Sequence, residues 1–280
     1  MLHIEDDKSP QYPIIISIIK KQPYALKGPN TSNMTTAGRS LVEFLGLRID
    51  LPNKPTGKMF GTVKAIQNSQ ESYLYNREAA DSEPIASGYP NALLTGPSRA
   101  LSADADFCIY FDLRDGENGH EISKGSTVNR HVYDGFLADT VDGQYGRSTL
   151  TYILMRNAAE ALIEVFLVDV GGEEKATEMH GTIAAAFSTY PAFKIELFRK
   201  APGEAINAKP GEPIPLLRSA LALPVDETLT ISAYLGSQDS PSTNDDVAAG
   251  DAEFVAGDGD AASRSISGKN GRIDVRVRWM

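Results

Sequence analysis

The sequence is poor in cysteine, the residue that builds disulfide frameworks, because Cys108 is the one cysteine in 280 residues. A single cysteine excludes an internal disulfide, which indicates a reducing compartment, the cytoplasm first and the nucleus as the alternative. Cys108 lies inside a predicted strand and has no histidine near it in sequence to activate it. We therefore interpret it as a structural thiol rather than a nucleophile.

Long apolar runs are also lacking. The longest isoleucine-rich run, at residues 14–19, is far shorter than the about 20 residues that a membrane-spanning helix needs. The first ten residues are acidic rather than basic, unlike a secretory signal peptide. We therefore expect no membrane partner.

Basic residues are outnumbered, with 27 Lys and Arg against 37 Asp and Glu and a net charge of -10. A surface that binds nucleic acid needs clustered Lys and Arg, so we expect no DNA partner and no ribosomal RNA surface. Histidine is scarce as well, and its four copies do not have the spacing of a zinc pair. They are His3, His120, His131 and His180.

No metal or other cofactor is predicted. The weak candidates for calcium ligands are Asp258 and Asp260, in the acidic segment 244–260. That segment lacks the twelve-residue calcium-loop pattern, and a solvated loop explains its composition equally well. We therefore predict no metal site there.

What the sequence does contain is a two-residue alternation of apolar and polar side chains. In FCIYFDLR at 107–114 every second side chain is apolar, and in GRIDVRVRWM at 271–280 isoleucine, valine and tryptophan alternate with arginine and aspartate. Successive side chains of a strand point to opposite faces, so both segments are predicted strands with one face on a core. Trp279 is predicted to anchor that core.

Further short segments are rich in β-branched or aromatic residues and bounded by Gly, Pro or Asn, which predicts strands. They cover residues 42–51, 59–66, 72–76, 148–155, 177–187, 192–200, 214–225 and 229–237. Residues 161–170 are apolar on both faces, as in a central strand. Helix is the alternative over 156–168, and the β-branched Val165, Val168 and Val170 favour strand. Residues 115–147 are predicted to hold only weak strands.

Many short strands without alternating helices predict a mainly all-β fold, an antiparallel β-sandwich or barrel-like sheet packing with few short helices. Residues 1–40 are predicted to be an N-terminal lead-in or extension, and residues 41–280 a single β-rich domain. Within it, the segment 238–267 is rich in Ser, Asp, Ala and Gly, which predicts a flexible acidic loop, with the short run AEFVAGD at 252–258 as an alternative ordered interruption.

A series of motifs carries a family resemblance over roughly residues 40–279. In chain order they are FGTVKAIQ with SYLYNRE, LTGPSRAL, FCIYFDLR, STLTYILMRNAAEALIEVFLVD, MHGTIAA, RSALALPV, LTISAYL and IDVRVRW. Together they resemble a plant domain family of unknown function that is expanded in grasses. Some cereal members lie C-terminal to a ribosome-inactivating domain, as in the jasmonate-induced ribosome-inactivating proteins. The resemblance implies a β-rich module in a plant stress or defence context, with a ribosome-inactivating domain as one partner.

The chain itself is not predicted to be an enzyme. Ribosome-inactivating domains carry a catalytic Glu with an Arg three residues later, whereas Glu160 is followed at that spacing by Ile163. Without the Arg, no cation stabilises the charge that develops on the departing base. A nucleophile elbow and a phosphate loop are also absent from the sequence. An enzyme whose site is assembled from distant residues remains an alternative.

Binding of a protein partner is the expected function. Arg272, Arg276 and Arg278 share one face of the last predicted strand, where they would grip an acidic partner or form cross-strand ion pairs.

A further alternative is a translation-linked module that binds a cap-like, positively charged base between aromatic rings. Because Trp279 is the single tryptophan, Tyr73, Tyr75 and Tyr110 are the candidate aromatic residues for such a site.

Overall fold

The structure is a computed structural model that describes residues 38–52, 54, 56–87, 90–171, 176–190, 193–225, 227–237, 246–256 and 260–280. All of them belong to one compact unit. The predicted lead-in therefore lies outside the described residues up to residue 37.

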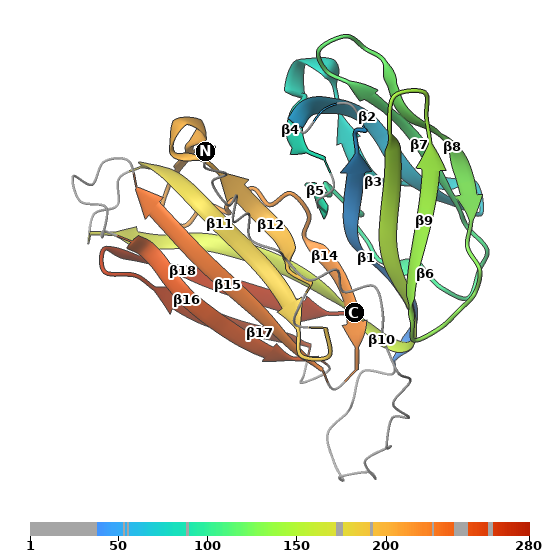
Figure 1. Ribbon diagram of the computed structural model, residues 1–280. Helices are drawn as coiled ribbons and strands as arrows, with labels where there is room; N and C mark the ends of the chain where they lie inside the picture. The colour runs from blue at the N-terminus through green and yellow to red at the C-terminus, as the bar shows by residue number, and fades with distance from the viewer. Residues whose placement is uncertain are drawn as a thin grey trace, which may run out of the picture. The chain divides into compact units, whose positions relative to one another are not determined.

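The described chain consists of antiparallel strands joined by loops and two short 3-10 turns (Figure 1). The turns are η1 (Ala79–Asp81) and η2 (Pro202–Glu204). The strands are β1 (Arg39–Asp50), β2 (Thr56–Gln67), β3 (Gln70–Arg77), β4 (Glu83–Ala86), β5 (Pro90–Ala92), β6 (Leu101–Ser102), β7 (Cys108–Asp115), β8 (Glu121–Val128), β9 (Phe136–Asp142), β10 (Arg147–Val170), β11 (Thr177–Phe187), β12 (Ile195–Lys200), β13 (Ile206–Ala208), β14 (Ala220–Pro224), β15 (Thr228–Ser237), β16 (Asp246–Val255), β17 (Ala261–Ser267) and β18 (Gly271–Trp279).

These strands form three sheets, which confirms the mainly all-β prediction. The first sheet has the strand order β17-β18-β10-β1-β5; β14 and β9 also pair with β10, and β6 also pairs with β1. The second sheet has the order β12-β11-β15-β16, and β13 also pairs with β11. The third sheet has the order β3-β2-β7-β8, and β4 also pairs with β2. No helix in the described part of the chain is long and apolar enough to cross a membrane.

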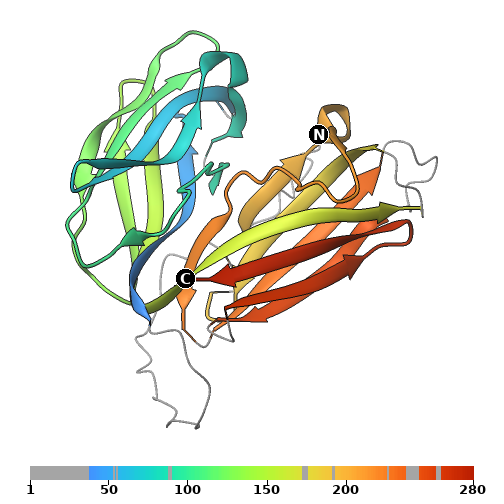
Figure 2. The same cartoon turned by 180° about the vertical axis from the view of Figure 1, so that it is seen from behind.

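Strand β10 connects two groups of strands, as Figure 2 shows for the yellow-green ribbon. Its first half pairs with β9 and β1, and its second half pairs with β14 and β18. The strand prediction over 161–170 is confirmed, and 148–155 belongs to the same strand. The pairing with β14 over Ala158–Leu162 supplies backbone partners that outweigh the helix propensity of this alanine-rich segment.

The buried apolar side chains divide between two cores, which the sequence did not predict. In one, Val165 and Val275 lie opposite each other across β10 and β18, and Ile183 and Ile231 belong to the same cluster, as does Trp279. In the other, the ring centroid of Phe44 lies 5.9 Å from that of Tyr152 and 6.5 Å from that of Phe107. Trp279 is 5% exposed, so its predicted role as a core anchor is confirmed.

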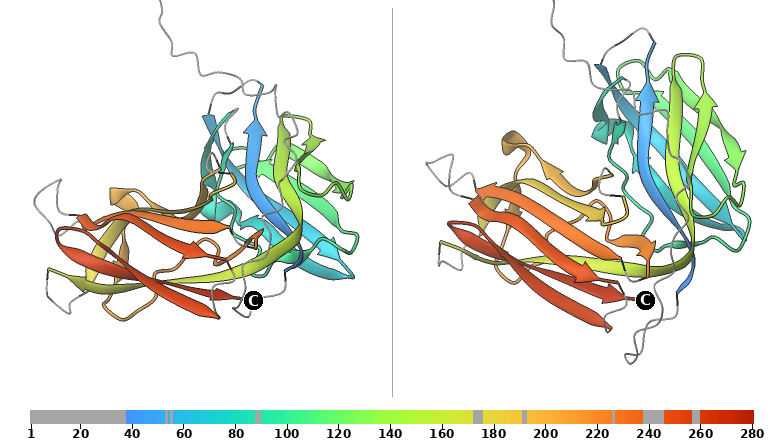
Figure 3. Two further views of the ribbon diagram at one scale, coloured as in Figure 1. Left: turned by 90° about the horizontal axis from the view of Figure 1, so that it is seen from below. Right: turned by 60° about the horizontal axis from the view of Figure 1, so that its bottom comes forward.

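The predicted flexible loop at 238–267 is wrong where the structure describes it. Residues 246–255 form β16, which pairs with β15, and residues 261–267 form β17, which pairs with β18 (Figure 3). Val247, Ala252 and Phe254 are buried, so β16 contributes side chains to a core despite its polar composition. Residues 238–245 and 257–259 lie outside the described part.

Two other strand predictions need correction. The segment 115–147 contains two regular strands, β8 and β9, because each pairs along its length with a neighbour, β7 and β10 respectively. Within 214–225 only β14 is a strand, since the residues before it make isolated backbone hydrogen bonds, such as those from the Ile214 N–H to the Val165 carbonyl and from the Leu217 N–H to the Leu197 carbonyl, rather than a continuous ladder.

Candidate functional site

Two of the three candidate tyrosines lie together on the outer face of the β3-β2-β7-β8 sheet. Lys64 on β2 is opposite Tyr73 on β3 and opposite Tyr110 on β7, so the three side chains form one row across the sheet. Tyr73 is 41% exposed and Tyr110 is 40% exposed. The row is therefore open to solvent.

Glu71, which lies opposite Ile66 in the neighbouring row, links the side chains of Lys64 and Tyr73. The Lys64 Nζ donates to Glu71 Oε1 at 2.6 Å, and the Tyr73 hydroxyl donates to Glu71 Oε2 at 3.1 Å. The Lys64 Nζ also lies 5.8 Å from the centroid of the Tyr73 ring, within the range of a cation–π contact. The hydrogen bond from Lys64 lowers the pKa of Glu71 and raises the pKa of Lys64. Both groups are therefore charged over the whole neutral range.

An apolar row lies beside the tyrosine row on the same face. Ile66 is opposite Cys108, and Cys108 is opposite Val128. Residues two positions apart on a strand share a face, so Ile66 lies beside Lys64 and Cys108 beside Tyr110. Val128 is 61% exposed. We call this surface, made of Lys64, Ile66, Tyr73, Cys108, Tyr110 and Val128, the tyrosine face.

Tyr75 is not part of this face, which corrects the sequence prediction. Its side chain is fully buried, and its hydroxyl donates to the Met59 carbonyl at 3.2 Å. Burial raises the pKa of Tyr75 well above its usual value. The cause is a register shift between Val63 and Lys64, which places Tyr75 opposite the buried Val63 and Tyr73 opposite the half-buried Lys64.

The three predicted arginines lie on the exposed side of β18, as the alternation indicated. The Arg272 Nη2 lies 3.8 Å from Asp169 Oδ2, and the Arg276 guanidinium lies 4.2 Å from the centroid of the Phe166 ring. Arg278 is opposite Leu162 and has no ion pair with the described residues. Their binding role stays a prediction.

The calcium candidates are not supported by a cluster. Asp258 lies outside the described residues, and Asp260 is exposed, with its backbone carbonyl accepting from the Trp279 N–H at 2.9 Å. Within the described part of the chain, no group of three His, Cys, Asp or Glu side chains is arranged to hold a metal ion.

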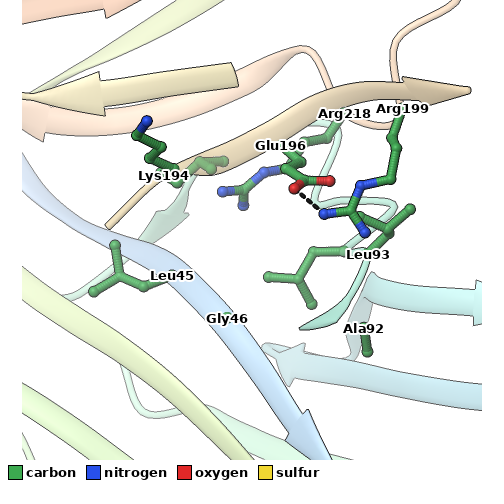
Figure 4. A pocket seen from close by; sticks show the side chains of 10 residues that line it. Leu45, Gly46, Ala92, Leu93, Lys194, Glu196, Arg199 and Arg218 are labelled. Carbon is green, nitrogen blue, oxygen red and sulfur yellow. Dashed lines mark hydrogen bonds and ion pairs between the residues drawn. The ribbon is translucent and has the colours of Figure 1, made fainter. Parts of the chain in front are cut away.

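A charged pocket that the sequence did not predict has a cavity of about 60 Å³ (Figure 4). Its charged lining side chains are Lys194, Glu196, Arg199 and Arg218. Its apolar lining comes from β1, from the end of β5 and the segment after it, and from β12: Leu45, Gly46, Ala92, Leu93, Leu94 and Ile195. The lining therefore combines a few charged groups with an apolar wall, an arrangement suited to holding a small charged group.

The base of the pocket is a buried ion pair. The Arg218 Nη2 donates to Glu43 Oε1 at 2.8 Å, and the Ala222 N–H donates to Glu43 Oε2 at 2.6 Å. The two side chains are 1% and 3% exposed. Burial raises the pKa of Glu43 to about 7, although Arg218 and the Ala222 N–H act in the opposite direction, and burial lowers the pKa of Arg218. Arg218 Nε has no hydrogen-bond partner among the described residues.

Three charged side chains of the β12 region line the pocket. Lys194 and Arg199 are exposed, and Glu196 forms an ion pair with Arg199 through its Oε1. The other oxygen, Glu196 Oε2, is buried without a partner in the described chain. Figure 4 shows the carboxylate of Glu196 next to the guanidinium groups of Arg199 and Arg218.

Two charged residues inside apolar runs of the sequence indicate the buried ion pair at this pocket. Glu43 lies in the apolar run LVEFLGL and Arg218 in the apolar run PLLRSALAL. A charged residue inside an apolar strand must be paired when it is buried, so each was a candidate for a buried ion pair. Their separation of 175 residues hid which partner each would take.

Glu160, the residue nearest to a glycosidase motif, is a structural carboxylate. It is 1% exposed and accepts from Arg39 at 2.8 Å, from Arg99 at 2.8 Å and from the Ala100 N–H at 2.8 Å. Both arginines come from other segments of the chain, so the carboxylate ties β1 and the segment before β6 to β10.

The comparison with solved structures gives distant matches. A structure of the two C2 domains of Extended-Synaptotagmin 2 is 10% identical with a TM-score of 0.26, covering 94% of this chain and 98% of that chain. The human GIVD cytosolic phospholipase A2 is 10% identical with a TM-score of 0.26, covering 89% of this chain and 33% of that chain. TM-scores at this level do not establish a shared arrangement of strands.

The comparison of sequences gives a family. No curated protein matches the chain. A family model described as a domain of unknown function, DUF6598, matches residues 41–277. This confirms the resemblance to a domain family of unknown function, while its link to grasses and to ribosome-inactivating proteins stays a prediction. Since the match spans most of the sequence, the chain belongs to the DUF6598 family of domains of unknown function.

Proposed function

We propose that the chain is a non-enzymatic binding module that recognises a protein partner through the tyrosine face. The observation that carries this proposal is the meeting of Tyr73 and Tyr110 around Lys64, beside the exposed Val128. Exposed tyrosines supply a large apolar area and a polar hydroxyl with little conformational entropy to lose, and they are enriched at protein interfaces. An isolated exposed tyrosine would carry no such meaning, whereas two in one row with apolar neighbours form a contiguous surface.

The proposed partner is a positively charged protein. The chain carries a net charge of -10, which favours encounter with a basic surface. A ribosome-inactivating domain is such a protein, because an enzyme that acts on ribosomal RNA needs clustered Lys and Arg. This choice of partner, with its plant stress and defence context, rests on the sequence resemblance, and the encounter would take place in a reducing compartment.

The tyrosine face is less suited to a cap-like base. Neighbouring strands lie about 4.8 Å apart, so Tyr73 and Tyr110 stand on strands about 10 Å apart with Lys64 between them. A positively charged base between the two rings would have to displace Lys64 and would be repelled by its ammonium group. For this reason we favour a protein partner over a cap-binding function.

The double variant Tyr73→Ser and Tyr110→Ser is expected to bind a purified ribosome-inactivating domain with a roughly 30-fold higher Kd than the wild-type chain. That factor corresponds to about 2 kcal/mol, as expected when aromatic anchors are removed from the centre of an interface. Isothermal titration calorimetry of the full chain measures it. Unchanged thermal unfolding of the variant shows that the sheet is intact.

Tyr145→Ser and Tyr234→Ser together provide the matched control. These tyrosines are 42% and 59% exposed and lie away from the tyrosine face, on the segment before β10 and on β15. The control pair keeps the wild-type Kd if the proposal is correct. An equal loss in both pairs, or no measurable binding by the wild-type chain, would contradict it.

A further inference from the structure

We propose that the charged pocket binds a single phosphate group, with Lys194, Arg199 and the buried Arg218 as its cationic donors. This inference is separate from the proposed protein interface, because the pocket and the tyrosine face share no residue. It goes beyond partner recognition and gives the chain a second ligand, of defined chemistry.

The size of the pocket fits such a group. A water molecule needs about 10–15 Å³ of cavity volume measured in this way, and the pocket offers about 60 Å³. The space therefore accommodates a group of roughly four or five heavy atoms, which is the size of a phosphate.

The charge of the pocket also fits an anion. Its lining contributes three cations, Lys194, Arg199 and Arg218, and one anion, Glu196. Glu43, behind Arg218, adds a second anion when it is ionised. The net charge of these side chains is positive whether Glu43 is ionised or protonated. A guanidinium group is the side chain best suited to the oxygens of a phosphate.

Two buried atoms without partners specify the ligand further. Arg218 Nε is an unused donor, and Glu196 Oε2 is an unused acceptor among the described residues. Buried polar atoms are normally paired, so a ligand that fills the pocket should accept from the first and donate to the second. A phosphate whose second pKa is about 6 retains a proton in part of its molecules near neutrality, so it offers both an acceptor oxygen and a donor hydroxyl.

Calorimetric titration of the full chain with sodium phosphate at pH 6.5 and constant ionic strength tests this inference. The expected result is saturable binding at one site, with sulfate at least ten-fold weaker. Sulfate has the same shape as phosphate but carries no proton at this pH, so it places a bare oxygen against Glu196. Absence of saturable heat with phosphate would overturn the proposal, and so would equal binding of the two anions.

Variants at the opening locate the site without disturbing the buried pair. Arg199→Gln and Lys194→Gln should each weaken phosphate binding about ten-fold, because each removes one cation. Glu196→Met should tighten the binding of both anions and abolish the preference for phosphate. Lys124→Gln and Arg264→Gln, exposed cations on β8 and β17, are the controls and should leave the affinity unchanged. Equal losses in the control variants would assign the binding to general charge and overturn the site.

The phosphate can come from free phosphate or from a phosphorylated protein. A short phosphoserine peptide and its unphosphorylated form distinguish the two sources in the same titration. Tighter binding of the phosphopeptide than of inorganic phosphate supports the site and identifies a phosphoprotein as the source. Weaker binding of the phosphopeptide supports the site and identifies free phosphate. Equal binding of the two peptides would show that the phosphate is not recognised and would overturn the proposal.

Discussion

Replacing Arg218 with methionine is expected to lower the free energy of unfolding by about 3–5 kcal/mol, because the change leaves the Glu43 carboxylate buried without its cation. Both side chains are almost fully buried, so water cannot replace the lost partner. Urea denaturation of the full chain, followed by circular dichroism, measures the loss. A loss below about 1 kcal/mol would show that the ion pair is solvated and would contradict its assignment as a buried pair.

The stability lost in the Arg218→Met variant should depend on pH. Burial raises the pKa of Glu43 from its ordinary value of 4.5 to about 7, so the folded chain holds this proton more tightly than the unfolded chain. A carboxyl group whose pKa is higher in the folded chain makes the free energy of unfolding fall as the pH rises from about 4.5 to about 7. Without Arg218 the carboxyl is forced further toward its neutral form, so the loss in the variant should be smaller at pH 5 than at pH 8.

The double variant Glu43→Gln and Arg218→Met is the matched control. Glutamine keeps an oxygen that accepts from the Ala222 N–H and removes the uncompensated charge. Stability should therefore recover by most of the loss seen in the Arg218 variant, and the part of the pH dependence between 5 and 8 that Glu43 causes should disappear. A double variant as unstable as the single one would mean that packing of the Arg218 stem, rather than charge, causes the effect.

Gly181→Ala is expected to destabilise the chain by about 3–5 kcal/mol. Gly181 lies inside β11 with a φ of +122°, and a Cβ at this position would lie 2.1 Å from the Tyr234 carbonyl oxygen on β15. Alanine would therefore add backbone strain of about 1–2 kcal/mol and force two paired strands apart. Thermal unfolding of the purified variant measures the effect.

The reference for this change is Gly203→Ala. Gly203 lies in η2, and a Cβ there would have no atom within 4 Å, so its stability should stay within about 0.5 kcal/mol of wild type. Gly61 offers an independent check, because its φ is +116° and its Cβ would lie 2.1 Å from the Asp112 carbonyl oxygen on β7. If Gly61→Ala and Gly181→Ala are both as stable as Gly203→Ala, the close approach of the strands is contradicted.

The fold class could be predicted because the strands with one buried face leave a two-residue period in the sequence. This period is clear in β7 and β18, where the buried side chains are large and the exposed ones are charged. It is hidden in β16, whose residues between Val247 and Phe254 are small or acidic on both faces. Neighbouring strands complete such an element, and a single sequence does not contain the register that makes them neighbours.

The candidate site could be predicted in part. The sequence offers Tyr73 and Tyr110 as candidate aromatic residues because it has a single tryptophan, and the structure brings them to one row. Tyr75 was chosen with them and is buried, because one extra residue in β3 relative to β2 changes its face. The Glu43–Arg218 pair could not be found, since it joins two segments through tertiary packing alone.

The most direct test of the binding proposal uses the single cysteine of the chain as a reporter. Cys108 is half-buried on the tyrosine face, opposite Val128 and Ile66. The rate at which its thiol reacts with a disulfide reagent is measured for the free chain and for the chain saturated with a ribosome-inactivating domain. The proposal predicts at least a ten-fold slower reaction in the complex, because a partner on this face covers the thiol. An unchanged rate in a complex shown to be saturated would place the partner elsewhere and contradict the proposal.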